Sequence, residues 1–141
     1  MRGRIPGDPK ADRWSRHDWW GVVLDAPDAR RLAEFYERIT GWELRADEDD
    51  FVTLGPPEGV AYLAFQTQRD PDFAAPTWPA AEGRQQMMMH LDFEVSDLDA
   101  AVADAVAMGA RAAEFQPQDD VRVMLDPAGH PFCLYAATDA D

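Results

Sequence analysis

The feature that most constrains the fold of this sequence is an internal repeat. The stretch GVVLDAPDARRLAEFYERITGW, which begins at Gly21, aligns with HLDFEVSDLDAAVADAVAMGAR, which begins at His90, at an offset of 69 residues. Apolar residues recur three or four positions apart in both stretches, which predicts an amphipathic helix in each half. The matched apolar positions are Ala29, Leu32, Ala33, Tyr36 and Ile39 in the first copy and Leu98, Ala101, Val102, Ala105 and Met108 in the second.

Each predicted helix has signals for its start and its end. Asp28 suits the first turn of the first helix, where a carboxylate meets the positive end of the helix dipole. Ser96 is the predicted N-cap of the second helix, with Asp99 three residues later in the capping-box position. Gly41 and Gly109 follow the two helices, where a left-handed residue is favoured.

Strands are expected on both sides of each helix. VVLDA and LDFEV precede the helices, and WELRA and RAAEF follow them. Each copy then ends in a strand, a Pro/Gly turn and a second strand, in DDFVTLGPPEGVAYLAF and DDVRVMLDPAGHPFCLY. The repeat therefore predicts two strand–helix–strand–strand–strand units, whose curved four-stranded halves enclose a cleft.

The boundaries of these units follow from composition. A chain of 141 residues is expected to form one domain. We expect a flexible N-terminal arm over residues 1–16, which are rich in Arg, Gly and Pro, and a single domain over residues 17–138. Within that domain, module one covers residues 17–66, a Pro- and Ala-rich linker covers 67–86, and module two covers 87–138.

Charge and composition narrow the classes of function. The net charge of −14 argues against a nucleic-acid partner, because phosphate binding needs concentrated Lys and Arg. The acidity agrees either with solubility alone or with attraction of a cationic small molecule. The N-terminus lacks the apolar region of a secretory signal, and no apolar run approaches the roughly 20 residues of a membrane helix. We therefore expect a cytoplasmic protein with no membrane partner.

Four stretches carry motifs that are specific in combination: VVLDAPDARRLAEFYERITGWEL, APTWP, HLDFEVSDLDAAVADAVAMGA and LDPAGHPFCLY. Together they resemble the vicinal oxygen chelate superfamily (glyoxalase I, extradiol dioxygenases and bleomycin-resistance proteins), and most of all its small bacterial glyoxalase-like domain proteins. The similarity covers Trp19 to Ala137. It implies an α+β fold of tandem βαβββ modules with pseudo-twofold symmetry, in which mixed sheets curl around an open cleft and the helices lie outside.

The resemblance also implies a metal site in the metal-using members, with one ligand from the first strand and one from the last strand of each module. In this sequence His90 holds the first-strand position of module two, and Gly21 holds the same position in module one. Cys133 holds the last-strand position of module two, and its counterpart is Leu63 or Ala64. Because the ligand set is incomplete, no cofactor is expected, and a divalent metal at His90 is the alternative.

The alternation of side chains along a strand places His90, Asp92 and Glu94 on one face. Asp92 is close enough to approach a metal on His90, but Glu94 is too far along the strand. Without a metal, His90 is either a hydrogen-bonded residue of the cleft or a general acid or base.

The same alternation predicts the residues that line the cleft. One wall is expected to be apolar and the other acidic and polar, which is typical of a pocket for an organic ligand. The predicted ligand-binding residues are His90, Asp92, Glu94, Cys133 and Tyr135 from module two, Val23, Leu63 and Phe65 from module one, and Trp78 from the linker as a lid.

From the sequence we therefore expect a glyoxalase-like protein, without a complete metal site, that binds an aromatic or cationic metabolite or drug. The alternative is a divalent-metal-dependent lyase, isomerase or dioxygenase with an altered ligand set. A third hypothesis is an interaction protein with no small ligand. The sequence leaves open whether a reaction is catalysed and whether the protein is a monomer or a homodimer.

Overall fold

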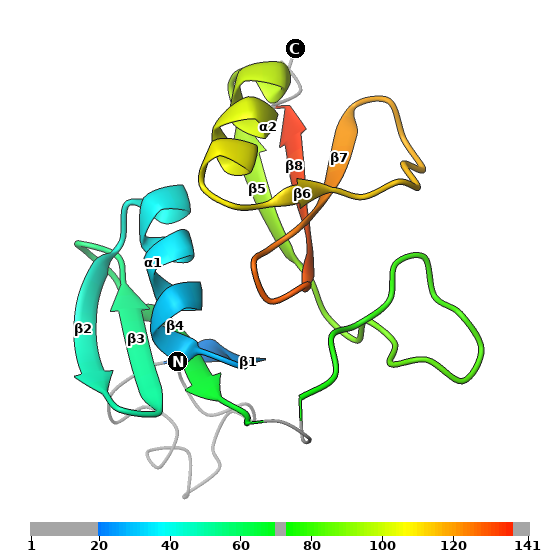
Figure 1. Ribbon diagram of the computed structural model, residues 1–141. Coiled ribbons are helices and arrows are strands. Elements are labelled where there is room, and N and C mark those ends of the chain that lie inside the picture. The colour runs from blue at the N-terminus through cyan, green and yellow to red at the C-terminus, as the bar shows by residue number, and fades with distance from the viewer. Residues whose placement is uncertain (1–19, 70–72, 137–141) are drawn as a thin grey trace, which may run out of the picture.

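A computed structural model describes residues 20–69 and 73–136, and the N-terminal arm expected over residues 1–16 lies outside this part of the chain. The elements follow one another as strand, helix and three strands, twice (Figure 1). They are β1 (Trp20–Ala26), α1 (Ala29–Thr40), β2 (Glu43–Glu48), β3 (Phe51–Gly55), β4 (Ala61–Thr67), β5 (Leu91–Val95), α2 (Leu98–Ala107), β6 (Arg111–Ala112), β7 (Val121–Leu125) and β8 (Pro131–Ala136). Neither helix is long and apolar enough to cross a membrane.

The two modules form separate four-stranded sheets of identical topology. Sheet one has the order β1-β4-β3-β2 and sheet two has the order β5-β8-β7-β6. In each sheet the first and last strands of the module pair in parallel, and the remaining pairs are antiparallel. The predicted α+β fold of tandem βαβββ modules with mixed, open sheets is therefore confirmed.

The helix starts differ in one detail from the sequence prediction. Asp28 caps α1, because its side chain accepts a hydrogen bond from the backbone N–H of Arg31 at 3.0 Å. The N-cap of α2 is Asp97 and not Ser96, since the Asp97 carboxylate accepts from the N–H of Ala100 at 3.0 Å. The two modules therefore begin their helices with the same residue type, at the same place in the repeat.

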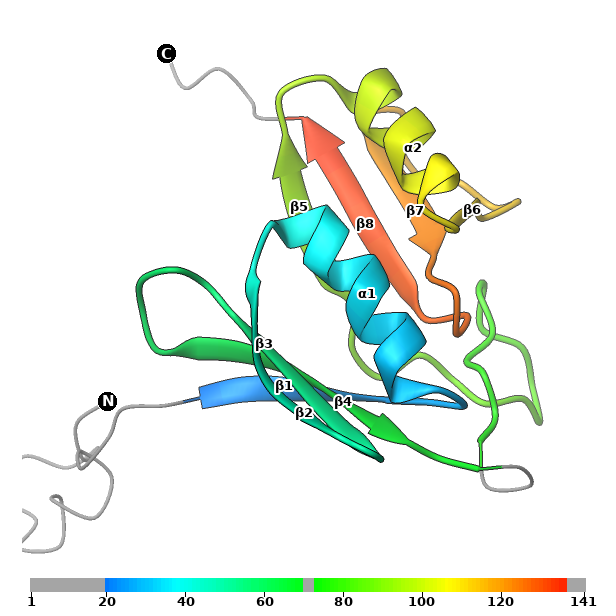
Figure 2. The same cartoon turned by 60° about the vertical axis from the view of Figure 1, so that its left-hand side comes forward.

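Helix α1 joins the two modules into one hydrophobic core. It lies where the two sheets meet, whereas α2 covers only sheet two (Figure 2). Phe35 and Tyr36 of α1 are buried and pack edge-on against Phe132 of β8, at ring-centroid distances of 5.8 and 6.4 Å. Tyr36 also stacks on Phe65 of sheet one at 5.5 Å.

The two faces of β4 are exchanged relative to the sequence prediction, because the predicted register of this strand was wrong by one residue. Val22 of β1 pairs with Leu63, and Leu24 pairs with Phe65, so these side chains share the face that α1 covers. Leu63 and Phe65 are 6% and 0% exposed and belong to the core. The expectation that they line the cleft was therefore wrong.

The cause of this error is the turn before β4. The turn glycines, Gly59 and Gly129, are 70 residues apart, whereas the paired strands keep the repeat offset of 69. Aligning the glycines therefore shifts β4 by one residue, which exchanges its two faces.

Candidate functional site

The open face of sheet two, which carries no helix, brings together three side chains with metal-binding chemistry. His90 lies directly before β5, and its Nε2 is 3.1 Å from Oδ1 of Asp92. Asp92 pairs with Cys133 of β8, so the two side chains point the same way. One ligand atom from each of the three residues lies within 4.8 Å of the others. The sequence prediction that Asp92 shares a face with His90 is consistent with this geometry.

The environment of Cys133 keeps its thiol protonated. Burial, followed by the charge of Asp92 and a hydrogen bond to it, raises the pKa of Cys133 to about 11. A thiol with such a pKa is a poor nucleophile near neutral pH, because the thiolate is the reactive form. Cys133 and the neighbouring His90 are therefore poorly arranged for nucleophilic catalysis.

The other predicted residues of this region lie around the cluster. Glu94 pairs with Tyr135 on the same open face, two residues further along β5 and β8 than Asp92 and Cys133. Glu94 is exposed and Tyr135 is partly buried. Val23 lies on β1 with 48% of its surface exposed.

The ligand positions of module one do not fit a metal. Gly21 occupies the position of His90 in the repeat, and a β-carbon there would lie 2.5 Å from ring atoms of Tyr62. Ala64, which pairs with Val23, occupies the position of Cys133. These two positions therefore do not complete the four-ligand arrangement that the resemblance implies, and among the described residues His90, Asp92 and Cys133 form the group that could hold a metal. A set of one nitrogen, one oxygen and one sulfur donor suits zinc.

A cavity of about 500 Å³ lies between β1 of module one and the segment Gln85–Met89 that leads into β5. Its lining combines apolar side chains with a few polar groups and comes from both modules and the linker. The lining residues are Val22, Val23, Leu24, Asp25, Gln68, Phe73, Ala74, Pro76, Gln85, Gln86, Met87, Met88, Met89 and His130. Of the ligand-binding residues predicted from the sequence, only Val23 lines this cavity.

Trp78 occupies a different place from the expected lid. Its indole N–H donates to the carbonyl of Phe115 at 3.1 Å, and the two rings lie 6.3 Å apart. Trp78 is not among the residues that line the 500 Å³ cavity. It fastens the linker to the segment between β6 and β7.

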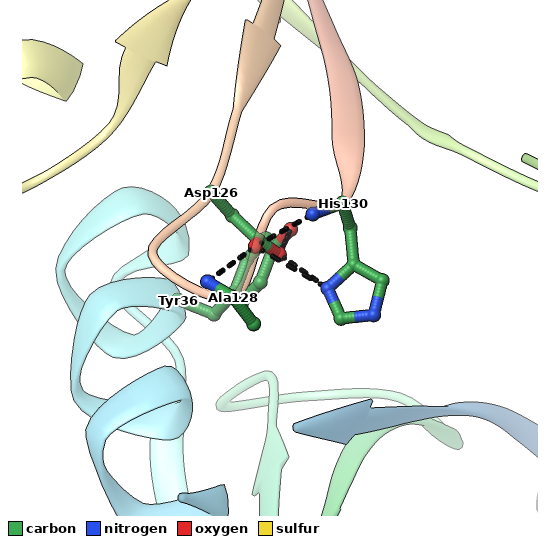
Figure 3. Close-up of polar contacts among 4 residues, drawn as sticks. All are labelled: Tyr36, Asp126, Ala128 and His130. Atoms are coloured by element: carbon green, nitrogen blue, oxygen red, sulfur yellow. Dashed lines mark hydrogen bonds and ion pairs between the residues drawn. The ribbon is translucent and has the colours of Figure 1, made fainter. Parts of the chain in front are cut away.

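His130, which is not among the site residues predicted from the sequence, has a buried partner in the structure (Figure 3). Asp126 is 2% exposed, and its Oδ1 accepts hydrogen bonds from the backbone N–H groups of Ala128 and His130 at 2.9 and 3.0 Å. Its Oδ2 accepts from the hydroxyl of Tyr36 at 2.9 Å and lies 3.0 Å from Nδ1 of His130. The DPAGH sequence of this turn shows the aspartate and the histidine, but not the tyrosine of α1.

Comparisons with solved structures agree with this fold. A glyoxalase/bleomycin resistance protein/dioxygenase family enzyme from Burkholderia phytofirmans PsJN superposes with a TM-score of 0.60 at 19% identity, covering 84% of this chain and 97% of that one. A glyoxalase/bleomycin resistance protein from Albidiferax ferrireducens T118 gives 0.57 at 17% identity, covering 86% and 99%. A lactoylglutathione lyase from Agrobacterium tumefaciens gives 0.51 at 15% identity, covering 83% and 91%. At these identities the similarity shows the fold alone.

A search of curated proteins gives no match to the sequence. The family model of the glyoxalase-like domain matches residues 21–135, which span both modules and the linker. This agrees with the paired βαβββ sheets and with the resemblance inferred from the repeat. The chain therefore belongs to the glyoxalase-like domain family.

Proposed function

We propose that this protein binds a small organic molecule, an aromatic or cationic metabolite or drug, in the cavity between β1 and Gln85–Met89. The observation that carries the proposal is the cavity itself, whose volume of about 500 Å³ lies in the range of small-molecule sites. Three consecutive methionines, Met87–Met89, supply flexible and polarisable surface that adapts to different ring shapes.

The charge of the site favours a neutral or cationic ligand over an anion. Asp25 lines the cavity, and no Lys or Arg is among the described lining residues. The whole chain carries a net charge of −14, which raises the local concentration of cations. An anionic ligand would have to approach against this field.

A thermal-shift screen of aromatic and cationic small molecules tests the proposal. A ligand present at 100 times its Kd stabilises the folded state by about 2.7 kcal/mol, which raises the Tm by several degrees. The substitution Val23→Phe narrows the cavity and should reduce the shift. The matched control is Val60→Phe, at an exposed valine that is outside the cavity lining. A folded protein whose Tm no compound of either class raises would contradict the proposal.

The cluster of His90, Asp92 and Cys133 favours a second candidate function, that of a divalent-metal-dependent lyase, isomerase or dioxygenase with an altered ligand set. A bound divalent ion would stabilise the thiolate form of Cys133 and so oppose burial and the charge of Asp92, which raise the pKa of this thiol. Titration with Co²⁺ tests this candidate, because cobalt bound to a thiolate gives a characteristic charge-transfer absorption. The band should appear at stoichiometric metal and be lost in His90→Ala, and Glu94→Gln serves as the control outside the cluster. Absence of the band would leave the metal-free binding function.

A further inference from the structure

The polar network around Asp126 determines which hydrogen bonds its carboxylate accepts. Two backbone N–H groups donate to Oδ1, and the hydroxyl of Tyr36 donates to Oδ2. Burial, then the charge of Asp126 and the hydrogen bond to it, raise the pKa of Tyr36 well above its usual value. The phenol therefore stays protonated and donates a hydrogen bond to Asp126. Oδ1 is therefore an acceptor for the two backbone N–H groups, which only donate, and Oδ2 is an acceptor for the Tyr36 hydroxyl.

The same network fixes the tautomer of His130. Its Nδ1 lies 3.2 Å from Oδ1 and 3.0 Å from Oδ2 of Asp126. Since both oxygens are acceptors, Nδ1 must carry the hydrogen. A neutral imidazole has one N–H, so Nε2 holds an unshared electron pair and is a hydrogen-bond acceptor.

The ring of His130 is held in a defined orientation. Phe73 of the linker contacts it edge-on, with ring centroids 6.1 Å apart and an interplanar angle of 72°. The His130 side chain is 18% exposed and lines the 500 Å³ cavity. Figure 3 shows its second ring nitrogen pointing away from Asp126.

The polar groups that line the cavity favour a ligand that donates hydrogen bonds. Asp25 accepts hydrogen bonds, as does Nε2 of a neutral His130, and the described lining contains no Lys or Arg. The glutamine side chains Gln68, Gln85 and Gln86 are able to donate or accept. The cavity is also lined by the ring of Phe73 and the thioethers of Met87–Met89, which pack well on an aromatic ring.

We propose that the cavity selects aromatic molecules that carry a hydrogen-bond donor, a phenolic hydroxyl or a protonated amine, and that Nε2 of His130 accepts the hydrogen bond. This inference rests on the proposed binding function and names the ligand chemistry within it. Asp126 is a positioning residue, because it acts on the ligand only through the tautomer and orientation of His130. Tyr36 supports Asp126 from the other side.

The tautomer is tested without any ligand. The ¹⁵N chemical shifts of the His130 imidazole, measured where the ring is neutral, should show hydrogen on Nδ1. In Asp126→Asn the amide oxygen would still accept the hydrogen bonds from the two backbone N–H groups. The amide NH₂ would then face Nδ1 of His130 and donate a hydrogen bond to it. The hydrogen should then move to Nε2. Circular dichroism checks that this variant is folded, and a wild-type signal from hydrogen on Nε2 would overturn the proposal.

The ligand selectivity is tested with a pair of probes that differ in one hydrogen-bond donor. 4-Methylphenol has a hydroxyl that stays protonated at neutral pH, and 4-methylanisole has a methoxy group in its place. The wild-type protein should bind the phenol about ten-fold more tightly, because the anisole would leave the acceptor Nε2 of His130 without a partner, and an unsatisfied buried polar group costs about 1–3 kcal/mol. His130→Phe, which keeps a flat ring against Phe73, should abolish this preference and still bind the anisole. Val106→Phe, on the exposed side of α2, is the control and should keep the preference.

The outcomes separate this inference from the proposed function. Equal affinity of the wild-type protein for the two probes would overturn the role of His130 and leave ligand binding intact. Failure of both probes, together with 4-nitrobenzylamine as the amine representative, would count against aromatic binding in this cavity as a whole. Binding of the amine and not of the phenol, with loss in His130→Phe, would assign the donor to a protonated amine.

Discussion

The substitution Tyr36→Phe isolates one buried hydrogen bond that holds the two modules together. It removes the hydroxyl that donates to Oδ2 of Asp126 at 2.9 Å. The aromatic ring stays, with its stacking on Phe65 and its edge contact with Phe132. Any change in stability therefore reports on the hydrogen bond and not on a cavity in the core.

The expected loss is about 2 kcal/mol of the free energy of unfolding, because a hydrogen bond to a charged group contributes about 1.5–3 kcal/mol. Asp126 is 2% exposed, so water cannot replace the lost donor. His130 still faces Oδ2 at 3.0 Å, which keeps the loss below that of a fully unpaired carboxylate. For a domain of this size the loss corresponds to roughly 8 °C in Tm.

Urea denaturation measures the difference in unfolding free energy between wild type and Tyr36→Phe, and its comparison at neutral and alkaline pH gives the direction in which this difference changes. The folded protein keeps Tyr36 protonated where the unfolded chain loses this proton, above a pH of about 10. The raised pKa of Tyr36 therefore stabilises the unfolded state relative to the folded state as the pH rises through that value. The difference between wild type and Tyr36→Phe should shrink in this alkaline range.

Tyr62→Phe is the matched control, because Tyr62 is only partly buried and no hydrogen bond of its hydroxyl is found among the described residues. Its free energy of unfolding should stay within about 0.5 kcal/mol of wild type. If Tyr36→Phe were equally neutral, the buried network would not contribute to stability, and the argument for the fixed tautomer of His130 would lose its support.

Three further substitutions test other parts of the structure. Gly21→Ala should cost about 1–3 kcal/mol of unfolding free energy by denaturation, since its β-carbon would lie 2.5 Å from the ring of Tyr62; a neutral result would contradict the close packing. Alkylation of Cys133 by iodoacetamide should follow a pKa of about 11, and Asp92→Asn should speed it near pH 8; an unchanged rate would exclude Asp92 as a cause. Asp97→Ala should lower the unfolding free energy by about 1 kcal/mol, and no loss would argue against its N-cap role.

The sequence predicts the modules well because their signals are local. Helix periodicity, the glycines after the helices and the strand patterns all act over a few residues, and the repeat doubles each of them. The face of β4 was missed because AYLAFQ is apolar on both sides, so alternation does not tell the faces apart. The N-cap of α2 was missed because Ser96 and Asp97 are adjacent and both suit that position.

The site is harder to predict because it depends on how the modules meet. The cluster of His90, Asp92 and Cys133 is visible in the sequence once β5 and β8 are known to pair. The cavity depends on where the linker runs, and no local pattern gives this path. The partner of Asp126 lies 90 residues away in α1, which is a contact that no motif in the turn predicts.

The position of α1 has a consequence for any attempt to separate the two halves. Phe132 belongs to module two but is buried against Phe35 and Tyr36 of module one. Cutting the chain in the linker and separating the fragments would expose Phe132 on the C-terminal fragment and the facing sides of Phe35 and Tyr36 on the N-terminal fragment. Co-expression of the two fragments should therefore rescue the solubility of the C-terminal piece through reassembly in trans.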